Sequence, residues 1–138
     1  MTPEETVAAW LALLNRDTDE PTALADDVVL HFYPDGSGGR RDERVGVDQT
    51  MTWIQRPPKG NYRFSADQIH AGPPAETLAP AELATHARFK VELTIAKWSN
   101  TGSWILHSSG PKITAVHHEP DKLPDDSAVE AFPEKKEG

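Results

Sequence analysis

The sequence predicts a single α+β domain in which N-terminal helices cover one face of a curved antiparallel sheet. Its 138 residues fit one domain with one hydrophobic core. Apolar residues recur at helical spacing near the N-terminus, whereas they alternate with polar residues through much of the second half. Because the helical patterns come first and the strand patterns follow, we expect two separate layers.

A helix is predicted at the N-terminus. Thr2 can cap it, Pro3 suits its first turn, and Glu5 completes a capping box. Four apolar side chains then fall on one helical face, namely Val7, Trp10, Leu11 and Leu14. We expect this helix to end near Asn15.

Shorter elements follow the first helix. Residues 21–25 predict a short helix that a proline opens, and residues 28–33 predict a strand because β-branched and aromatic residues dominate them. Residues 36–44 predict a flexible loop. Another helix is predicted over 47–55, and Pro57 prevents its continuation.

Strands dominate the second half of the chain. In residues 88–98, Phe89, Val91, Leu93 and Ile95 alternate with Arg88, Lys90, Glu92 and Thr94. The other strands are predicted over 62–70, 104–109 and 113–118, and Gly110-Pro111 forms the turn between the last two. A connection that prolines interrupt spans 72–84.

The domain is expected to occupy residues 1–120. Residues 121–138 are rich in charge and carry prolines, so they predict a flexible C-terminal tail.

The composition excludes several classes of function. The formal net charge of −8 argues against nucleic-acid binding, because phosphate contacts depend on Lys and Arg. Without cysteine, the chain has no disulfide, thiolate nucleophile or thiolate metal site. The sequence shows neither a signal pattern nor an apolar run of membrane-spanning length, so we expect a cytoplasmic protein with no membrane partner.

Residues 36–44 combine glycines with a local basic cluster. Their Gly36-Ser37-Gly38-Gly39 run opens no helix and does not predict a phosphate-binding loop. We interpret Arg40, Arg41 and Arg44 as part of a solvated loop, with a small-anion site as the alternative. No cofactor is predicted.

Four segments carry a resemblance to a known superfamily. They are residues 7–15 (VAAWLALLN), 24–34 (LADDVVLHFYP), 44–48 (RVGVD) and 110–113 (GPKI). In this order they resemble the nuclear-transport-factor-2-like superfamily, and within it the SnoaL-like and ketosteroid-isomerase-like proteins, over roughly residues 2 to 120.

The resemblance implies a cone-shaped sheet that wraps around the N-terminal helices and encloses a largely apolar pocket. It also implies a homodimer formed through the outer face of the sheet. Isomerases, epoxide hydrolases, polyketide cyclases, dehydratases and plain binding modules share this fold, so the fold leaves the activity open.

The catalytic groups of the ketosteroid isomerases are missing here. The position of their carboxylate base falls on Phe32 when the sequences are aligned at residues 25–27, and on Tyr33 when they are aligned at Pro34. Their tyrosine falls on Trp10, and their second aspartate falls near Trp104. Steroid-isomerase chemistry is therefore not expected.

The catalytic Asp-Arg-Asp group of the family's epoxide hydrolases is also incomplete here. Two of its residues lie two positions apart on a middle strand, and they fall on Lys90 and Glu92, or on Arg88 and Lys90 in a shifted register. The third residue falls on His118. Alternation argues that Lys90 and Glu92 face outward, because Phe89 and its apolar neighbours should face the helices.

A two-residue turn at Gly110-Pro111 would set the register of the last hairpin. It pairs Ser109 with Lys112, and by the same count His107 with Thr114. That register gathers Ile105, His107, Thr114, Val116 and His118 on one face, which the family register turns inward. It places Trp104 on the other face, where we expect Trp98 and Trp104 to contribute to a dimer interface.

These observations predict a protein that binds a small, largely apolar molecule and that, if it is an enzyme, has proton-transfer chemistry of the isomerase, cyclase, hydratase or dehydratase type. His118 would move protons, and His107 would orient ligand or water. The expected ligand-binding residues are Trp10, Leu14, Phe32, Trp53 and Val116. The alternative is a non-catalytic binding or dimerisation module, which a pocket without ionisable groups would favour.

No metal site is predicted. His117 and His118 are adjacent in a strand and point to opposite faces, so they chelate poorly. Two less favoured arrangements stay open, a catalytic pair of His31 and Tyr33 and a metal site of His31, His107 and His118.

Overall fold

The computed structural model describes residues 1–32, 42–55, 62–74, 83–95 and 97–121. Its elements in chain order are α1 (Pro3–Leu14), β1 (Leu24–Phe32), β2 (Asp42–Val45), α2 (Val47–Ile54), β3 (Tyr62–Gly72), β4 (Leu83–Leu93), β5 (Trp98–Ser109) and β6 (Lys112–Pro120). The strands form a six-stranded sheet of order β2-β1-β6-β5-β4-β3. All neighbouring strands run antiparallel except β1 and β6.

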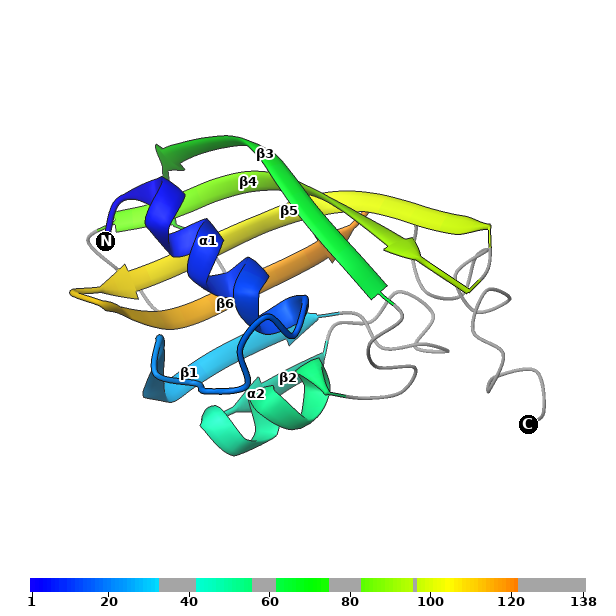
Figure 1. Cartoon of the computed structure of the whole chain (residues 1–138). Coiled ribbons are helices and arrows are strands. Elements are labelled where there is room, and N and C mark those ends of the chain that lie inside the picture. Colours follow the sequence, from blue (N-terminus) through cyan, green and yellow to red (C-terminus); the bar gives the residue numbers. More distant parts are fainter. Residues whose placement is uncertain (33–41, 56–61, 75–82, 96, 122–138) are drawn as a thin grey trace.

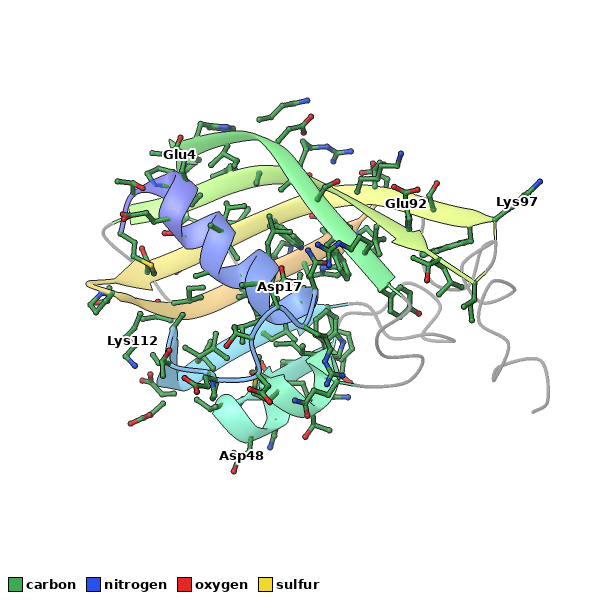
Figure 2. All side chains as sticks on the ribbon, in the orientation of Figure 1. Glu4, Asp17, Asp48, Glu92, Lys97 and Lys112 are labelled. Carbon is green, nitrogen blue, oxygen red and sulfur yellow. The ribbon has the colours of Figure 1, made fainter. Side chains whose placement is uncertain are left out.

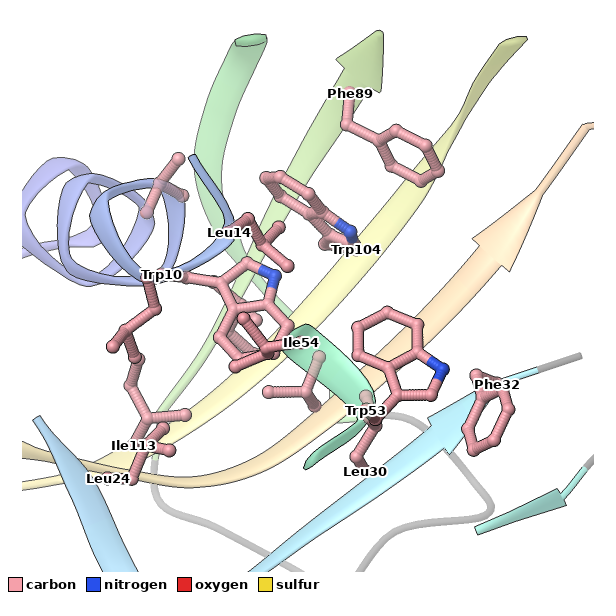
Figure 3. Packing of buried hydrophobic residues seen from close by; sticks show 14 of the residues in the cluster. Trp10, Leu14, Leu24, Leu30, Phe32, Trp53, Ile54, Phe89, Trp104 and Ile113 are labelled. Atoms are coloured by element: carbon pink, nitrogen blue, oxygen red, sulfur yellow. The ribbon is translucent and has the colours of Figure 1, made fainter. Parts of the chain in front are cut away.

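The predicted α+β class is confirmed. The sheet is curved and unclosed, α1 lies across one of its faces, and α2 lies beside β1 and β2 (Figure 1). Both helices contribute buried side chains to one hydrophobic core, which the inner face of the sheet completes (Figure 3). Neither described helix has the length and apolar character needed to cross a lipid bilayer.

The beginning of α1 follows the predicted chemistry. Thr2 Oγ1 accepts a hydrogen bond from the Glu5 N–H, and Glu5 Oε1 accepts one from the Thr2 N–H, which confirms the capping box. The helix is capped at Asn15, where it was expected to end. The Asn15 side chain bonds both the N–H and the carbonyl of Phe64, so it anchors this end of α1 to β3.

The predicted short helix over 21–25 is wrong. Leu24 already belongs to β1, and the Ile113 N–H donates to the Ala23 carbonyl at 2.7 Å, so pairing with β6 extends this segment. The loop predicted over 36–44 is partly wrong as well, because Asp42–Val45 forms the edge strand β2. Residues 36–41, like the whole predicted tail after Asp121, lie outside the described residues.

The long alternating strand ends earlier than predicted. β4 stops at Leu93, Ile95 is exposed, and Trp98 begins β5. Within β4 the predicted alternation is confirmed, since Phe89, Val91 and Leu93 are buried whereas Lys90 and Glu92 are exposed. The apolar face of β1, which carries Val28, Leu30 and Phe32, also lies in the core as expected.

A β-bulge changes the register of the last hairpin. Ser109 pairs with Lys112 as predicted, and Ser108 pairs with Ile113, but His107 pairs with Ala115 because Thr114 is an extra residue. A slip of one residue moves every following side chain to the other face. The bulge therefore overturns the predicted faces of β5, whereas Val116 and His118 of β6 face inward as predicted.

Candidate functional site

The bulge arranges the inner face of the sheet in cross-strand rows. Leu30, Val116 and Leu106 form one row. Trp104 and His118 belong to the next row, and Phe89 and Gly102 lie opposite each other in the row after that. Only His118 among these residues combines an ionisable ring with partial exposure.

The His118 ring lies among three aromatic side chains from three elements. Phe89 of β4 stacks on it at a centroid distance of 4.8 Å and an angle of 20°. Trp53 of α2 meets it edge-on at 5.4 Å. Trp104 of β5 donates a hydrogen bond from its indole Nε1–H to Nδ1 of His118 at 3.0 Å. The ring is thereby fixed in position by contacts from α2, β4 and β5.

The hydrogen bond from Trp104 also decides the tautomer of His118. An indole nitrogen only donates, so Nδ1 must be the unprotonated nitrogen of the ring. The neutral ring therefore carries its proton on Nε2, where it can act as a hydrogen-bond donor. Protonation of Nδ1 would break the bond to Trp104.

Gly102 makes room for this cluster. A Cβ atom at this position would lie 2.4 Å from the ring of Phe89 and 2.5 Å from the carbonyl oxygen of Glu119. The carbonyl belongs to the backbone and cannot move aside at low cost. The absence of a side chain at residue 102 thus allows Phe89 to reach His118.

The cluster continues toward the edge of the sheet. The rings of Phe32 and Trp53 lie 5.3 Å apart (Figure 3). The Arg44 guanidinium sits 4.8 Å above the Phe32 ring and bonds Asp42 at 3.0 Å. The pKa of Asp42 is below its usual range, because its carboxylate accepts hydrogen bonds from the Glu43 N–H and from Arg44.

The five predicted ligand-binding residues all lie in the core, but at different depths. Trp10 and Val116 are fully buried, and Leu14 packs with them. Trp10 meets Trp104 edge-on at 6.4 Å, and its own Nε1–H has no acceptor among the described residues. Phe32 contacts Trp53, which in turn meets the His118 ring edge-on. The deep end of the interior is therefore filled by side chains of the protein.

The structure does not bring His107 and His118 together. His107 is buried on the opposite face of the sheet, because the bulge at Thr114 separates the two registers. The expectation that His107 shares a face with His118 is wrong. The expected place of Trp104 on the outer face is wrong for the same reason, and Trp98 likewise packs against the core.

Two further histidines lie on the outer face as neighbours. Their rings, those of His31 and His117, lie 6.4 Å apart. His31 bonds Glu43 at 3.1 Å, and His117 bonds Glu119 at 3.2 Å. The imagined metal site of His31, His107 and His118 does not form, since His118 faces inward. No group of three metal-ligating side chains occurs in the described ranges, and Tyr33 lies outside them.

The positions that resemble the epoxide-hydrolase group are split between the two faces. Lys90 and Glu92 are exposed on the outer face, where Lys90 Nζ lies 3.8 Å from Glu92 Oε1. Arg88, on the same face, bonds Asp121 and Ser103. Figure 2 shows Glu92 close to the end of β4. His118 cannot act with these residues because the sheet lies between them.

Comparisons with known proteins support the fold. A proposed polyketide cyclase from Pseudomonas putida is 17% identical, with 96% of this chain and 98% of that chain covered at a TM-score of 0.60. A proposed ketosteroid isomerase from Kribbella flavida is 15% identical, with 88% of this chain and 81% of that chain covered at a TM-score of 0.61. An LEH-like epoxide hydrolase from M. tuberculosis is 25% identical, with 85% of this chain and 78% of that chain covered at a TM-score of 0.53. The chain has the nuclear-transport-factor-2-like fold.

The resemblance seen in the sequence is thus confirmed for the nuclear-transport-factor-2-like fold. No protein-family model matches the sequence, and the comparison with curated proteins finds no match. Sequence reasoning named His118, Phe32 and Trp53 as candidate site residues but missed Phe89, Trp104 and Gly102 as partners of the histidine. The alternation of β4 gave a signal for Phe89, whereas Trp104 depended on the unmarked bulge.

Proposed function

We propose that the protein binds a small, largely apolar molecule against the aromatic cluster around His118, formed by Phe89, Trp104 and Trp53. The observation that carries this proposal is the 3.0 Å hydrogen bond from Trp104 to His118 Nδ1. It holds an ionisable ring in one orientation among aromatic walls and directs its remaining N–H away from Trp104.

The chemistry we propose is polarisation of a ligand oxygen by His118 Nε2–H. A neutral imidazole that donates to a carbonyl or hydroxyl oxygen stabilises negative charge that develops there during proton transfer. Isomerisation, cyclisation, hydration and dehydration pass through such charge when the proton is transferred at a carbon next to a carbonyl group. In this proposal His118 serves as a hydrogen-bond donor, whereas the sequence analysis expected it to move protons.

A matched pair of probes tests the role of the donor. Acetonaphthone and ethylnaphthalene have similar shapes, but only the ketone carries an acceptor oxygen. Quenching of tryptophan fluorescence should show both probes binding to the wild-type protein. His118→Phe preserves a flat ring and removes the N–H, so it should weaken ketone binding about tenfold and leave the hydrocarbon unaffected. Equal effects on both probes would contradict the donor role.

A second pair of variants tests the site itself. Trp53→Ala removes an aromatic wall next to His118 and should weaken both probes about tenfold or more. Thr52→Ala changes the neighbouring, exposed residue of α2 and should leave binding unchanged. If the wild-type protein bound neither probe, the proposed function would be lost.

The alternative function is a non-catalytic binding or dimerisation module. It is favoured by the missing isomerase groups and by the outward orientation of Lys90 and Glu92. We also propose that two copies of the chain pair through the outer face of the sheet, around Val29, Ile105 and Ala115. A separate proposal is that the protein works in the cytoplasm. The absence of cysteine is compatible with a reducing compartment.

A further inference from the structure

Arg44 lies at the border of the aromatic cluster, on the edge strand β2. It pairs with Leu30 of β1 across the edge of the sheet, so its side chain lies on the inner face. Its guanidinium lies 4.8 Å above the Phe32 ring, and Phe32 in turn contacts Trp53. A cation is thus placed beside the same aromatic wall that reaches His118.

Only one nitrogen of this guanidinium has acceptors in the described part of the chain. Nη1 donates to the Asp42 carboxylate at 3.0 Å and to the Glu43 carbonyl at 2.9 Å. No described residue accepts a hydrogen bond from Nη2 or Nε. Because the guanidinium presents its N–H groups as a rigid planar fork, the edge formed by Nη2 and Nε matches the two oxygens of one anion.

The neighbouring groups keep that edge in place. Asp42 is itself held by the Glu43 N–H at 2.8 Å, so its bond to Nη1 fixes the guanidinium over Phe32. The Glu43 carboxylate turns to the opposite face and bonds His31, so it does not compete for the fork. The Arg44 side chain is 36% exposed, which leaves it within reach of a ligand.

The spacing between Arg44 and His118 limits the size of the ligand. The two residues lie two strands apart and one row apart on the inner face, because Arg44 shares the row of Leu30 and Val116, and His118 is two residues further along β6. Strand spacing and residue rise place their Cα atoms about 12 Å from each other. A bicyclic body with one anionic group can therefore cover Trp53 and reach both side chains.

We propose that Arg44 binds the anionic group of the ligand, so that the ligand class is a flat, apolar acid with a carboxylate or sulfonate at one end. This inference rests on the proposed function, since it assigns one end of the same site. It adds the reason for a cation over Phe32, which binding of a neutral molecule does not require. The net charge of −8 repels anions at long range, so the contact depends on a directional fork.

Two fluorescent probes separate this inference from the proposed function. Anilinonaphthalene sulfonate and phenylnaphthylamine share an aromatic body, and only the former carries an anion. The wild-type protein should bind both at one site per chain, and the sulfonate more tightly. Arg44→Gln should weaken sulfonate binding about tenfold and leave phenylnaphthylamine binding unchanged, while Arg44→Lys should lie between.

The control variant is Arg63→Gln, which removes an exposed arginine that pairs with Asp17 at 3.6 Å and should leave both probes unaffected. Arg44→Gln should also retain the wild-type circular dichroism spectrum, and its unchanged phenylnaphthylamine affinity verifies an intact site. An unchanged affinity of Arg44→Gln for the sulfonate would overturn the role of Arg44, and so would an equal loss of affinity for both probes. Failure of both probes with the wild-type protein would instead remove the proposed function.

Discussion

Trp104 and His118 lie opposite each other on neighbouring strands, and the indole N–H of the first is bonded to Nδ1 of the second at 3.0 Å. Trp104 is completely buried, whereas His118 is partly exposed. The buried residue therefore dictates which nitrogen of the exposed one carries a proton. This relationship makes the donor role of His118 testable without a substrate.

Trp104→Phe should release the tautomer of His118. The variant keeps an aromatic ring but removes the donor, so both ring nitrogens become able to carry the proton. Nitrogen NMR of the wild-type protein should show an unprotonated Nδ1 in the neutral ring, and the variant should show a mixture. The loss of the bond and of packing should lower the free energy of unfolding by about 1–3 kcal/mol. A wild-type ring protonated on Nδ1 would contradict the structure.

Gly102→Ala should disturb the stack of Phe89 on His118. The new methyl group would lie 2.4 Å from the Phe89 ring and close to a backbone carbonyl, so overpacking should cost about 1–3 kcal/mol of unfolding free energy. Denaturant unfolding measures the cost, and the ring-current shifts of the His118 protons report the displaced ring.

Gly110→Ala is the matched control for this variant. Gly110 has a φ of 58°, and a methyl group there would meet no atom within 4 Å, so alanine costs only the left-handed conformation, about 1 kcal/mol. The shifts of His118 should stay as in the wild type. Unchanged His118 shifts in Gly102→Ala would show that residue 102 does not set the stack.

The elements that sequence reasoning found are those with a strong local signal. The capping box of Thr2 and Glu5 fixed the start of α1, and the alternation around Phe89 gave the faces of β4. Both signals depend on neighbours within a few residues. The inward orientation of His118 came from the resemblance to the family and not from pairing.

The elements that sequence reasoning missed depend on distant partners. Nothing in residues 107–114 marks Thr114 as the bulged residue, yet this single insertion separates His107 from His118. The strand β2 has the polar sequence DERV and forms because β1 offers it an edge. The sequence left a small-anion site among Arg40, Arg41 and Arg44 open only as an alternative to a solvated loop. The placement of Arg44 follows from β2, since a loop would not hold the guanidinium over Phe32.

Asp121→Asn should reduce stability at neutral pH and not in acid. Hydrogen bonds from Arg88 and Thr101 hold the pKa of Asp121 below the ordinary value of 3.8. A lowered carboxylate pKa adds stability above that ordinary value, and this stability is lost as the pH falls through the lower pKa of the folded state. Because both side chains are partly exposed, the expected loss at pH 7 is below about 1 kcal/mol.

Thermal unfolding between pH 7 and pH 2 measures the effect of Asp121→Asn. The difference in Tm from the wild type should be a few degrees at pH 7 and should close below pH 3.8. Asp19→Asn, at an exposed position, serves as the control with no difference at either end. A difference in Tm between Asp121→Asn and the wild type that persisted at pH 2 would show that loss of the ion pair does not cause it.

Ile105→Glu should convert a dimer into monomers. Ile105 packs against Ala115 on the outer face, where His31 and His117 are also largely covered. A glutamate from each copy would place an unpaired charge in a shared apolar contact, at a cost of several kcal/mol. Light scattering should therefore give twice the chain mass for the wild type and the chain mass for the variant. Thr52→Glu, on the exposed side of α2, should remain dimeric, and a monomeric wild type would exclude the proposed pairing.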